Sequence, residues 1–357
     1  MAYTTVDDGS EYFHTILYTG NGSNGRAITN DANAGDFQPD WLWIKSRSSS
    51  SLAHRLYDSS RGAANDLRTH GDNADTQESN ALASFDSNGF TIGSAGDVNT
   101  NSATFVAWQW KANGGTTTTN DASATSIGTI DSVYQANTTA GFSIVTYTGT
   151  GSAGTIAHGL GVTPKLIIIK NRDTAESWRV ASDVIGYGNQ LLLGASGSDT
   201  EASDTNTFNN TAPTSTVFSV GTRNATNKSG DDLVAYVFAP IQGYSKIDSY
   251  IGNNSTNGTF VYTGFKPAWL LIKRTDSTTD WRIFDNKRDS DNVVKGRLFP
   301  NTSGSENTSQ DSLDFYSNGF KLKNTNSGSN GSGGEFIYMA FAEHPFVSSK
   351  GVPVTAR

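Results

Sequence analysis

The sequence predicts an all-β protein built from three tandem β-sandwich modules. One observation is a short apolar motif that occurs three times, as PDWLWIK, PKLIIIK and PAWLLIK at residues 39–45, 164–170 and 267–273. A short apolar run that follows a proline is typical of a buried strand, because proline is tolerated at a strand's first position. The other is spacing: the three prolines recur every ~100 to 125 residues, about the size of one small β-sandwich domain.

Other features recur in the same order around this motif. Upstream, an aromatic residue precedes a Gly/Asn turn at residues 18–22, 147–151 and 250–254. Downstream, a second predicted strand ends in aspartate in each copy, at Asp58, Asp183 and Asp285. Each unit closes with an aromatic strand, at residues 105–110, 233–238 and 336–341. Several features in a fixed order indicate a repeated structural unit rather than a chance match.

Asn-Gly pairs predict a β-hairpin in the first and third units. Asn88-Gly89 lies within residues 85–90, and the second pair lies within residues 315–320. A two-residue hairpin turn needs positive φ angles, which Asn and Gly tolerate best. Phenylalanine stands at both ends of each segment, so both arms would carry an aromatic core residue. The middle unit keeps only the strand at residues 217–220 and lacks the turn.

Length and composition favour several small cores. The 357 residues allow roughly two to three domains. Apolar residues make up only 35% of the chain and are concentrated in the predicted strands, so we expect three small cores rather than one large one. Turn-forming residues separate the strands at intervals of ~8–12 residues, as in all-β sandwiches. A short helix is predicted only at residues 61–68.

The repeat sets the predicted domain boundaries. The modules are predicted at residues 1–115, 126–245 and 246–346, followed by a C-terminal tail at residues 347–357. Residues 113–125 are rich in Gly, Thr and Asn and are predicted to be a linker. Inside the third module, residues 324–334 are almost entirely Gly, Ser and Asn. We expect this loop to be mobile or held by a partner.

Composition also excludes several classes of protein and site. There is no cysteine, so disulfides and cysteine-based metal sites are excluded. The first residues lack the basic and apolar regions of a signal peptide, and no apolar run is long enough to insert into a membrane. The net charge of −8 argues against nucleic acid as a partner. These features fit a protein that folds in a reducing cytoplasm.

No catalytic or metal site is predicted. The five histidines are scattered without metal-ligand spacing. The repeated Asp58, Asp183 and Asp285 are the best candidates for a glycosidase carboxylate pair, but recurrence in every unit favours a structural role, such as an Asx-type turn after the strand. Asp/Asn-rich loops such as residues 199–210 offer oxygen ligands for calcium, yet none has EF-hand or nonapeptide spacing. We therefore expect a protein without cofactors that is not an enzyme.

Two tryptophans are the candidate binding residues. Trp178 and Trp281 each precede an arginine in the second strand of their unit. Neighbouring strand residues point to opposite faces, so one of each Trp-Arg pair faces the core and the other the surface. An exposed Trp could stack on a sugar ring, whereas a buried one would be a core aromatic. The core is the favoured interpretation, and glycan contact is the alternative.

Several blocks of the sequence resemble one known repeat module. The matching blocks are AGFSIVTYTGTG, HGLGVTPK, YSNGF and YMAFAEHPF at residues 140–151, 158–165, 316–320 and 338–346. FQPDWLWIK, DSSRG and the terminal VTAR at residues 37–45, 58–62 and 354–357 belong to the same pattern. Together they resemble a module of virion structural proteins from tailed bacteriophages, marine ones especially. The resemblance covers most of the chain, and the second unit departs most because it lacks the Asn-Gly turn.

The resemblance implies a fold, a location and a role. It implies lectin-like, concanavalin-type or jelly-roll β-sandwiches, in a protein made in the host cytoplasm and exposed on the virion. It carries no shared catalytic residues. The role it favours is a tail-fibre or receptor-binding protein that contacts host surface glycans. The alternative is a capsid decoration protein or head fibre, and a glycan depolymerase ranks last. Three modules end to end would form an extended rod. Other virion proteins are the expected partners, together with further copies of this chain, as in a trimer.

Overall fold

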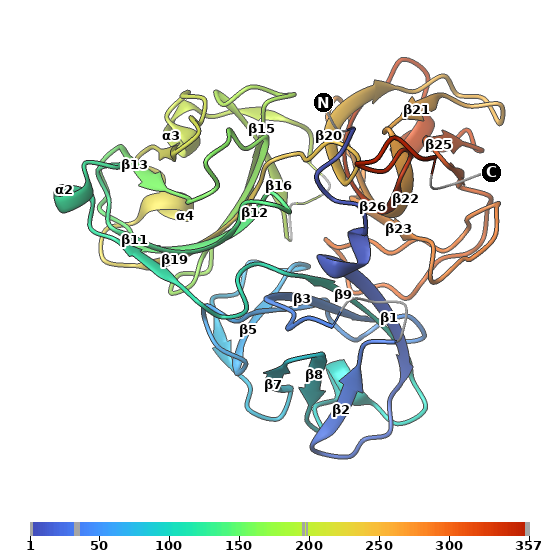
Figure 1. Cartoon of the computed structure of the whole chain (residues 1–357), viewed down its shortest axis with the longest axis horizontal. Coiled ribbons are helices and arrows are strands. Elements are labelled where there is room, and N and C mark those ends of the chain that lie inside the picture. The colour runs from blue at the N-terminus through green and yellow to red at the C-terminus, as the bar shows by residue number, and fades with distance from the viewer. Residues whose placement is uncertain (1–2, 32–35, 195–196, 198, 354–357) are drawn as a thin grey trace.

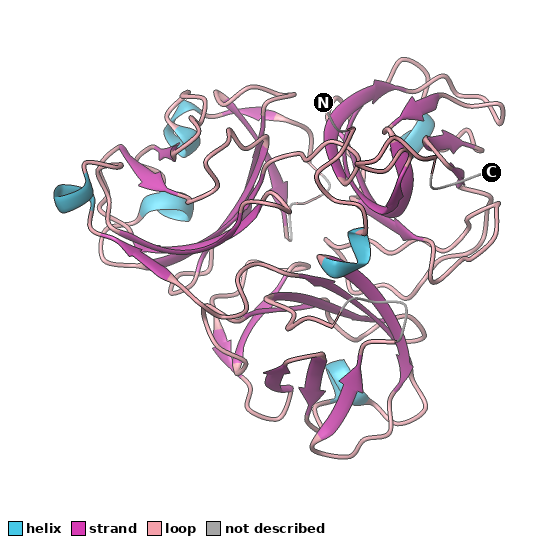
Figure 2. Ribbon diagram, viewed as in Figure 1, coloured by secondary structure: helices cyan, strands magenta, loops and turns pink. Residues whose placement is uncertain are grey.

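The computed structural model describes residues 3–31, 36–194, 197 and 199–353, and the chain is all-β (Figure 2). Within these residues, six sheets form three pairs, each made from one continuous stretch of chain. The pairs form three lobes around a common centre (Figure 1). We call residues 13–110 the first lobe, 118–238 the second and 245–345 the third. The C-terminal VTAR block lies outside the described residues.

Each lobe pairs a large sheet with a small one. In the first lobe the large sheet has the order β1-β9-β3-β4-β5-β6, with bounds Phe13–Thr19, Thr104–Trp110, Trp41–Ser46, Arg55–Asp58, Asn65–Arg68 and Thr76–Gln77. The small sheet has the order β2-β8-β7, with bounds Arg26–Thr29, Gly89–Ile92 and Leu82–Asp86. All neighbours in both sheets are antiparallel.

The second and third lobes repeat this plan. The large sheet of the second lobe is β10-β11-β12-β19-β14-β15-β16-β17, with bounds Thr118–Asn120, Ser132–Asn137, Phe142–Thr148, Asp232–Phe238, Leu166–Asn171, Trp178–Ser182, Asn189–Leu193 and Ala202–Ser203. Its small sheet pairs β13 with β18, Gly154–Ala157 with Val217–Val220. The large sheet of the third lobe is β20-β26-β22-β23, with bounds Ser245–Ile251, Glu335–Pro345, Phe265–Arg274 and Arg282–Asp285. Its small sheet is β21-β25-β24, with bounds Phe260–Tyr262, Gly319–Leu322 and Leu313–Tyr316.

The helices are single turns. They are the 3-10 helix η1 (Gly9–Glu11) and the α-helices α1 to α5, at Gly96–Asn99, Ala122–Thr125, Thr205–Phe208, Asn224–Asn227 and Ser327–Asn330. None of the helices in the described ranges is long and apolar enough to cross a membrane. The helix predicted at residues 61–68 is wrong: the segment forms a turn followed by β5. Gly62 there has φ of 94°, which a right-handed helix does not allow.

The repeated apolar motif forms strands that are buried on both faces. In β3, Trp41 and Trp43 face the common centre, whereas Leu42 and Ile44 pack against the first lobe's small sheet. In β14, Leu166 and Ile168 face the common centre, and the residues that alternate with them pack into the second lobe's own core. Two-sided burial explains the unbroken apolar run, because a strand with one solvated face would alternate with polar residues.

The large sheets meet in one shared aromatic core. Trp41 packs against Tyr236 of the second lobe, with 4.9 Å between ring centroids. Trp110 packs edge-on to Trp269 of the third lobe at 5.3 Å. Phe341 closes the ring against the second lobe, beside Phe238 at 6.1 Å. The expectation of three separate small cores holds only in part: the first and second lobes each have a small cluster of their own, but the largest buried cluster contains residues of all three lobes.

The lobes surround this core, so the expected end-to-end rod is also wrong. Figure 1 shows a three-cornered molecule with the N-terminal segment running beside the third lobe. The N-terminal and C-terminal segments meet there, because the hydroxyl and backbone N–H of Ser349 donate to the Asp7 carboxylate at 2.5 and 2.6 Å. Apolar residues concentrated in a few strands bury more area when the sheets pack back to back than when they stand in a row.

The predicted hairpins are confirmed, but their two-residue turns are Ser-Asn rather than Asn-Gly, because Asp86 pairs with Gly89 and Tyr316 with Gly319. Phe85 pairs with Phe90 across the β7–β8 turn, and Phe315 pairs with Phe320 across the β24–β25 turn. In the middle lobe β18 pairs with β13 and has no such hairpin partner, as its missing Asn-Gly pair indicated.

Two segments predicted to be loose are ordered. The predicted linker at residues 113–125 contains β10 and α2, and its start is fixed because the backbone N–H groups of Ala112, Gly114 and Gly115 donate to the Asp40 carboxylate. The loop at residues 324–334 contains α5 and makes hydrogen bonds within its own chain. Asn330 there is fully buried and donates to the carbonyl of Asn324 at 2.7 Å.

Candidate functional site

Trp178 and Trp281 lie in the seams between lobes. Trp178 is fully buried, and its indole nitrogen donates to the carbonyl of Arg68 in the first lobe at 3.0 Å. Trp281 is 2% exposed and donates to the carbonyl of Leu192 in the second lobe at 2.8 Å. Neither ring presents a face on which a sugar could stack. The interpretation of these two residues as glycan contacts is therefore wrong; they join each lobe to the preceding one.

His54 takes the corresponding place in the first lobe. Like the two tryptophans, it directly precedes an arginine of the second motif strand. It is fully buried, and its Nδ1 accepts a hydrogen bond from Trp43 at 2.9 Å. Burial lowers the pKa of His54 well below its usual value, and the backbone of Phe299 in the third lobe opposes that shift. The three lobes thus contact one another in a closed ring.

A buried acid–base network joins the first and second lobes across what we call the first seam. The Asp58 carboxylate accepts from the hydroxyl of Tyr236 at 2.7 Å and from Nε of Arg61 at 2.5 Å. Its other oxygen accepts the backbone N–H of Arg61 at 2.8 Å, which confirms the predicted Asx-type turn. Arg61 also binds Asp75 at 3.1 Å, and Asp75 binds Arg172 of the second lobe at 3.1 Å.

The same network joins the third and first lobes across the second seam. The Asp285 carboxylate accepts from the indole of Trp108 at 2.9 Å and from Nε of Arg288 at 2.5 Å. It also accepts the backbone N–H of Arg288 at 2.8 Å, so the turn prediction is confirmed here too. Arg288 binds Glu306 at 2.8 Å, and Glu306 accepts from Nε of Arg47 in the first lobe at 2.9 Å.

The second lobe breaks the pattern, and this corrects the role expected of Asp183. The strand register pairs the first core residue of each motif with this position: Trp41 with Asp58, Leu166 with Ser182, Trp269 with Asp285. Ser182 therefore takes the place of the acids. Asp183 lies one residue further and pairs with the half-exposed Lys165 at 2.9 Å. A shift of one residue turns a side chain to the other face of a strand.

The lysine that ends each motif is a buried cation. Lys45, Lys170 and Lys273 are each 0% exposed, and burial lowers the pKa of each to about 8. Lys45 donates to the carbonyl of Ser303 in the third lobe at 3.0 Å, and Lys170 to that of Asp72 in the first lobe at 3.2 Å. Lys45 and Lys170 therefore hold loops of neighbouring lobes in place rather than reaching solvent, whereas Lys273 donates to the carbonyl of Thr279 in its own lobe.

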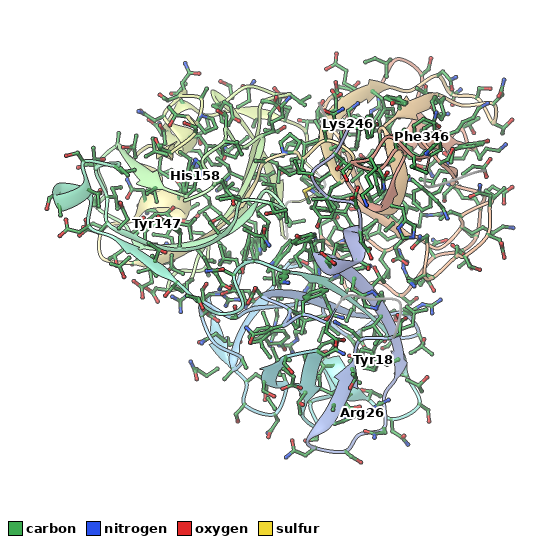
Figure 3. All side chains as sticks on the ribbon, viewed as in Figure 1. Tyr18, Arg26, Tyr147, His158, Lys246 and Phe346 are labelled. Atoms are coloured by element: carbon green, nitrogen blue, oxygen red, sulfur yellow. The ribbon has the colours of Figure 1, made fainter. Side chains whose placement is uncertain are left out.

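A surface hollow of about 350 Å³ lies where the second lobe, the third lobe and the N-terminal segment meet. Tyr262 lines it with a ring that is 51% exposed. Lys246, labelled on the third lobe in Figure 3, lies 5.8 Å from the centre of that ring and pairs with Asp248 at 3.4 Å. Tyr3 closes one wall and donates to the carbonyl of Gly264 at 2.7 Å.

This hollow combines an aromatic ring with hydrogen-bonding groups of both kinds. The amide of Gln242 and the amine of Lys165 also line it. Such a mixture suits a ligand with an apolar face and several hydroxyl groups. Among the described residues, no group of three or more His, Asp or Glu side chains is arranged to hold a metal ion.

Each buried network corresponds to an aspartate followed by an arginine three residues later. The aspartates were singled out from the sequence, but the arginines were not. Asp58 and Asp285 are each followed by arginine at the third position, whereas Ser182 is followed at that position by Ile185. The turn has the same form in the first two lobes, since Asn65 and Asn189 each donate to the carbonyl of the residue four positions earlier. The spacing of Asp and Arg in the first and third lobes therefore indicates an ion pair across the turn.

Comparison with known protein families gives one match, which spans the three lobes. A family described as a domain of unknown function (DUF7483) matches residues 8–345. The chain belongs to this family. Comparisons with curated proteins and with solved structures found no match. One family domain includes all three lobes, as expected for lobes that share one core and cannot be separated without exposing it.

Proposed function

We propose that this chain is a non-enzymatic structural protein of a bacteriophage particle, exposed on the virion surface, where it binds host surface glycans as a tail-fibre or receptor-binding protein. The support for the virion is the resemblance of the quoted sequence blocks. The support for binding is the hollow around Tyr262. We also propose that each lobe is one jelly-roll or concanavalin-like module, because the same central strand order recurs in all three large sheets, as β1-β9-β3-β4, β12-β19-β14-β15 and β20-β26-β22-β23.

The observation that carries the binding role is the half-exposed ring of Tyr262 at a junction of lobes. Sugars present a face of C–H groups that packs on an aromatic ring, while their hydroxyls need donors and acceptors at its rim. Lys246 and Asp248 supply both beside the ring. Because the indole of Trp281 ties the third lobe to the second through a hydrogen bond, the junction around the hollow is preorganised, which favours binding of a flexible glycan.

A glycan array and a host-cell binding assay test this role. We expect Tyr262→Ala to abolish binding while the protein keeps its thermal stability, since the ring is half exposed. Phe260→Ala is the matched control. Phe260 is 45% exposed on the same strand but does not line the hollow, so its removal should leave binding intact. Equal binding by wild type and Tyr262→Ala would refute the assignment.

The compact shape favours one alternative location. A three-cornered molecule with one shared core supplies no shaft, which suits a capsid decoration protein as well as the tip of a fibre. One chain already places three lobes around a common centre, so this three-lobed arrangement does not require a homotrimer. Cryo-electron microscopy of the particle tests the location: density on the tail supports receptor binding, density on the capsid supports decoration, and no density contradicts both.

A further inference from the structure

The third seam, between the second and third lobes, lacks both arginines that fill the other two seams. Ile185 stands where Arg61 and Arg288 stand in the first and second seams. Thr275 stands where Arg172 and Arg47 stand in the first and second seams. The carbonyl of each of these three residues accepts a backbone hydrogen bond from the acid of its seam. A cavity of about 230 Å³ occupies the space, and both Ile185 and Thr275 line it.

The acid of the network is nevertheless present in this seam. In each seam the backbone N–H of the acid donates to the carbonyl of a residue in the neighbouring lobe: Asp75 to Arg172 at 2.7 Å, Glu306 to Arg47 at 2.9 Å and Glu201 to Thr275 at 2.8 Å. Glu201 is thus anchored as its two counterparts are. Their carboxylates each bind two arginines.

Glu201 has no such partner. Among the described residues its carboxylate makes no hydrogen bond or ion pair, and a second carboxylate, that of Glu335, lines the same cavity. Burial and the charge of Glu335 both raise the pKa of Glu201. A half-buried acid beside a like charge is the environment that a bound cation relieves.

The remaining walls fit an alkyl stem. Ile185, Tyr250 and Phe336 line the cavity with apolar surface. An arginine side chain buries its methylene stem on apolar surface and presents a planar fork to a carboxylate. The cavity therefore offers a guanidinium group one anchored carboxylate and an apolar wall, as Glu306 and the ring of Trp108 do for Arg288, while Ser182 stands in the place of Asp285.

We propose that the cavity in the third seam binds a guanidinium group on an alkyl stem, held by Glu201 in the place that arginine occupies in the other two seams. The chemistry is shared by two sources, a small guanidine and an arginine side chain of another polypeptide. This site is separate from the hollow around Tyr262, so it stands whether or not that hollow binds glycans.

Binding of n-butylguanidinium to the full chain, followed by NMR or calorimetric titration, tests the proposal. We expect saturable binding, with n-butylammonium at least about tenfold weaker, because a carboxylate accepts the planar fork through two hydrogen bonds and an ammonium through one. Glu201→Gln should weaken n-butylguanidinium binding by about tenfold or more. Glu11→Gln is the control, since Glu11 is an exposed carboxylate outside the seam.

A second variant tests the same site by filling the cavity with a side chain of the protein itself. Thr275→Arg restores the arginine found in the other seams, so it should abolish n-butylguanidinium binding and raise the melting temperature. A blocked Gly-Arg-Gly peptide separates the two sources: its binding points to an arginine side chain, and binding of n-butylguanidinium alone points to a small guanidine. No saturable binding to the wild type, or unchanged binding by Glu201→Gln, would overturn the proposal.

Discussion

The hydroxyl of Tyr236 in the second lobe donates to the carboxylate of Asp58 in the first lobe across 2.7 Å, in a site where both side chains are fully buried. The two residues are 178 positions apart in the chain. Their contact places a charged group inside the seam, where Arg61 neutralises it. The aromatic core makes the seam largely apolar. The buried charge fixes how the two lobes align, because only one arrangement pairs it with Arg61.

Removing the charge of Asp58 should destabilise the whole molecule. Asp58→Asn leaves Arg61 buried without its main partner, and breaking one side of a buried ion pair costs about 3–5 kcal/mol. The free energy of unfolding from urea titration measures this. Asp183→Asn is the matched control, since Asp183 pairs only with Lys165 near the surface and should change stability by about 0.5 kcal/mol or less. Equal losses in the two variants would contradict the assignment of Ser182, rather than Asp183, to the repeated position.

Local sequence patterns predicted the strands and hairpins but not how the lobes meet. The motif of Trp41 to Ile44 predicted a buried strand, but not that its two faces pack against different partners. The low apolar content of the whole chain favoured three small cores over one large core, because it does not show how the apolar strands of different lobes pack together. The partner of a seam residue such as Asp58 lies far away in sequence. No periodicity within one lobe encodes that contact.

The same limit applies to the candidate binding residues. Trp178 begins β15 and Trp281 directly precedes β23, close to where the sequence placed them, but the choice between core and surface depended on a neighbouring lobe. Tyr262 was not singled out, because its importance comes from lining a hollow with Tyr3 and Lys165, which belong to other parts of the chain.

Trp281 should matter for stability and not for glycan binding. Trp281→Phe keeps most of the ring but removes the N–H that donates to Leu192, so a partly buried carbonyl loses this partner. We expect a loss of about 1–3 kcal/mol in the free energy of unfolding. The folded variant should bind host cells as the wild type does. Reduced cell binding at temperatures where the variant remains folded would revive the glycan-contact hypothesis.

The buried lysines should make the protein more stable as pH rises above neutrality. The pKa of Lys45, Lys170 and Lys273 is lowered from 10.5 to about 8 in the folded state. Between these values the unfolded chain binds more protons than the folded one, so the free energy of unfolding increases with pH. Urea titrations at pH 8.0 and 9.5 measure the increase; at pH 9.5 only about a quarter of each exposed tyrosine, with a pKa of about 10, is ionised.

The contribution of one lysine can be separated from the rest. Lys45→Met removes one of the three titrating amines, so the increase in stability between pH 8.0 and 9.5 should fall by about a third if the three are equivalent. Lys350→Met is the control, because Lys350 is exposed and its removal should leave the pH dependence unchanged. A pH dependence that is flat in the wild type would contradict burial of these amines in solution.

A buried asparagine should decide whether the loop at residues 324–334 is ordered. Asn330 accepts the backbone N–H of Asn253 at 3.0 Å and donates to the carbonyls of Asn324 and Ser255 at 2.7 and 2.9 Å. Asn330→Ala removes these bonds and leaves buried carbonyls without partners, which should cost about 2–4 kcal/mol.

Limited proteolysis shows the local effect. In the wild type we expect the loop to resist cleavage, because α5 packs beneath β22 and its asparagine is fully buried. In Asn330→Ala the loop should be cut first. Asn24→Ala changes an exposed asparagine in a turn of the first lobe and should leave the cleavage pattern as it is. Rapid cleavage of the wild-type loop would show that the amide does not hold it, and would restore the expectation of a mobile segment.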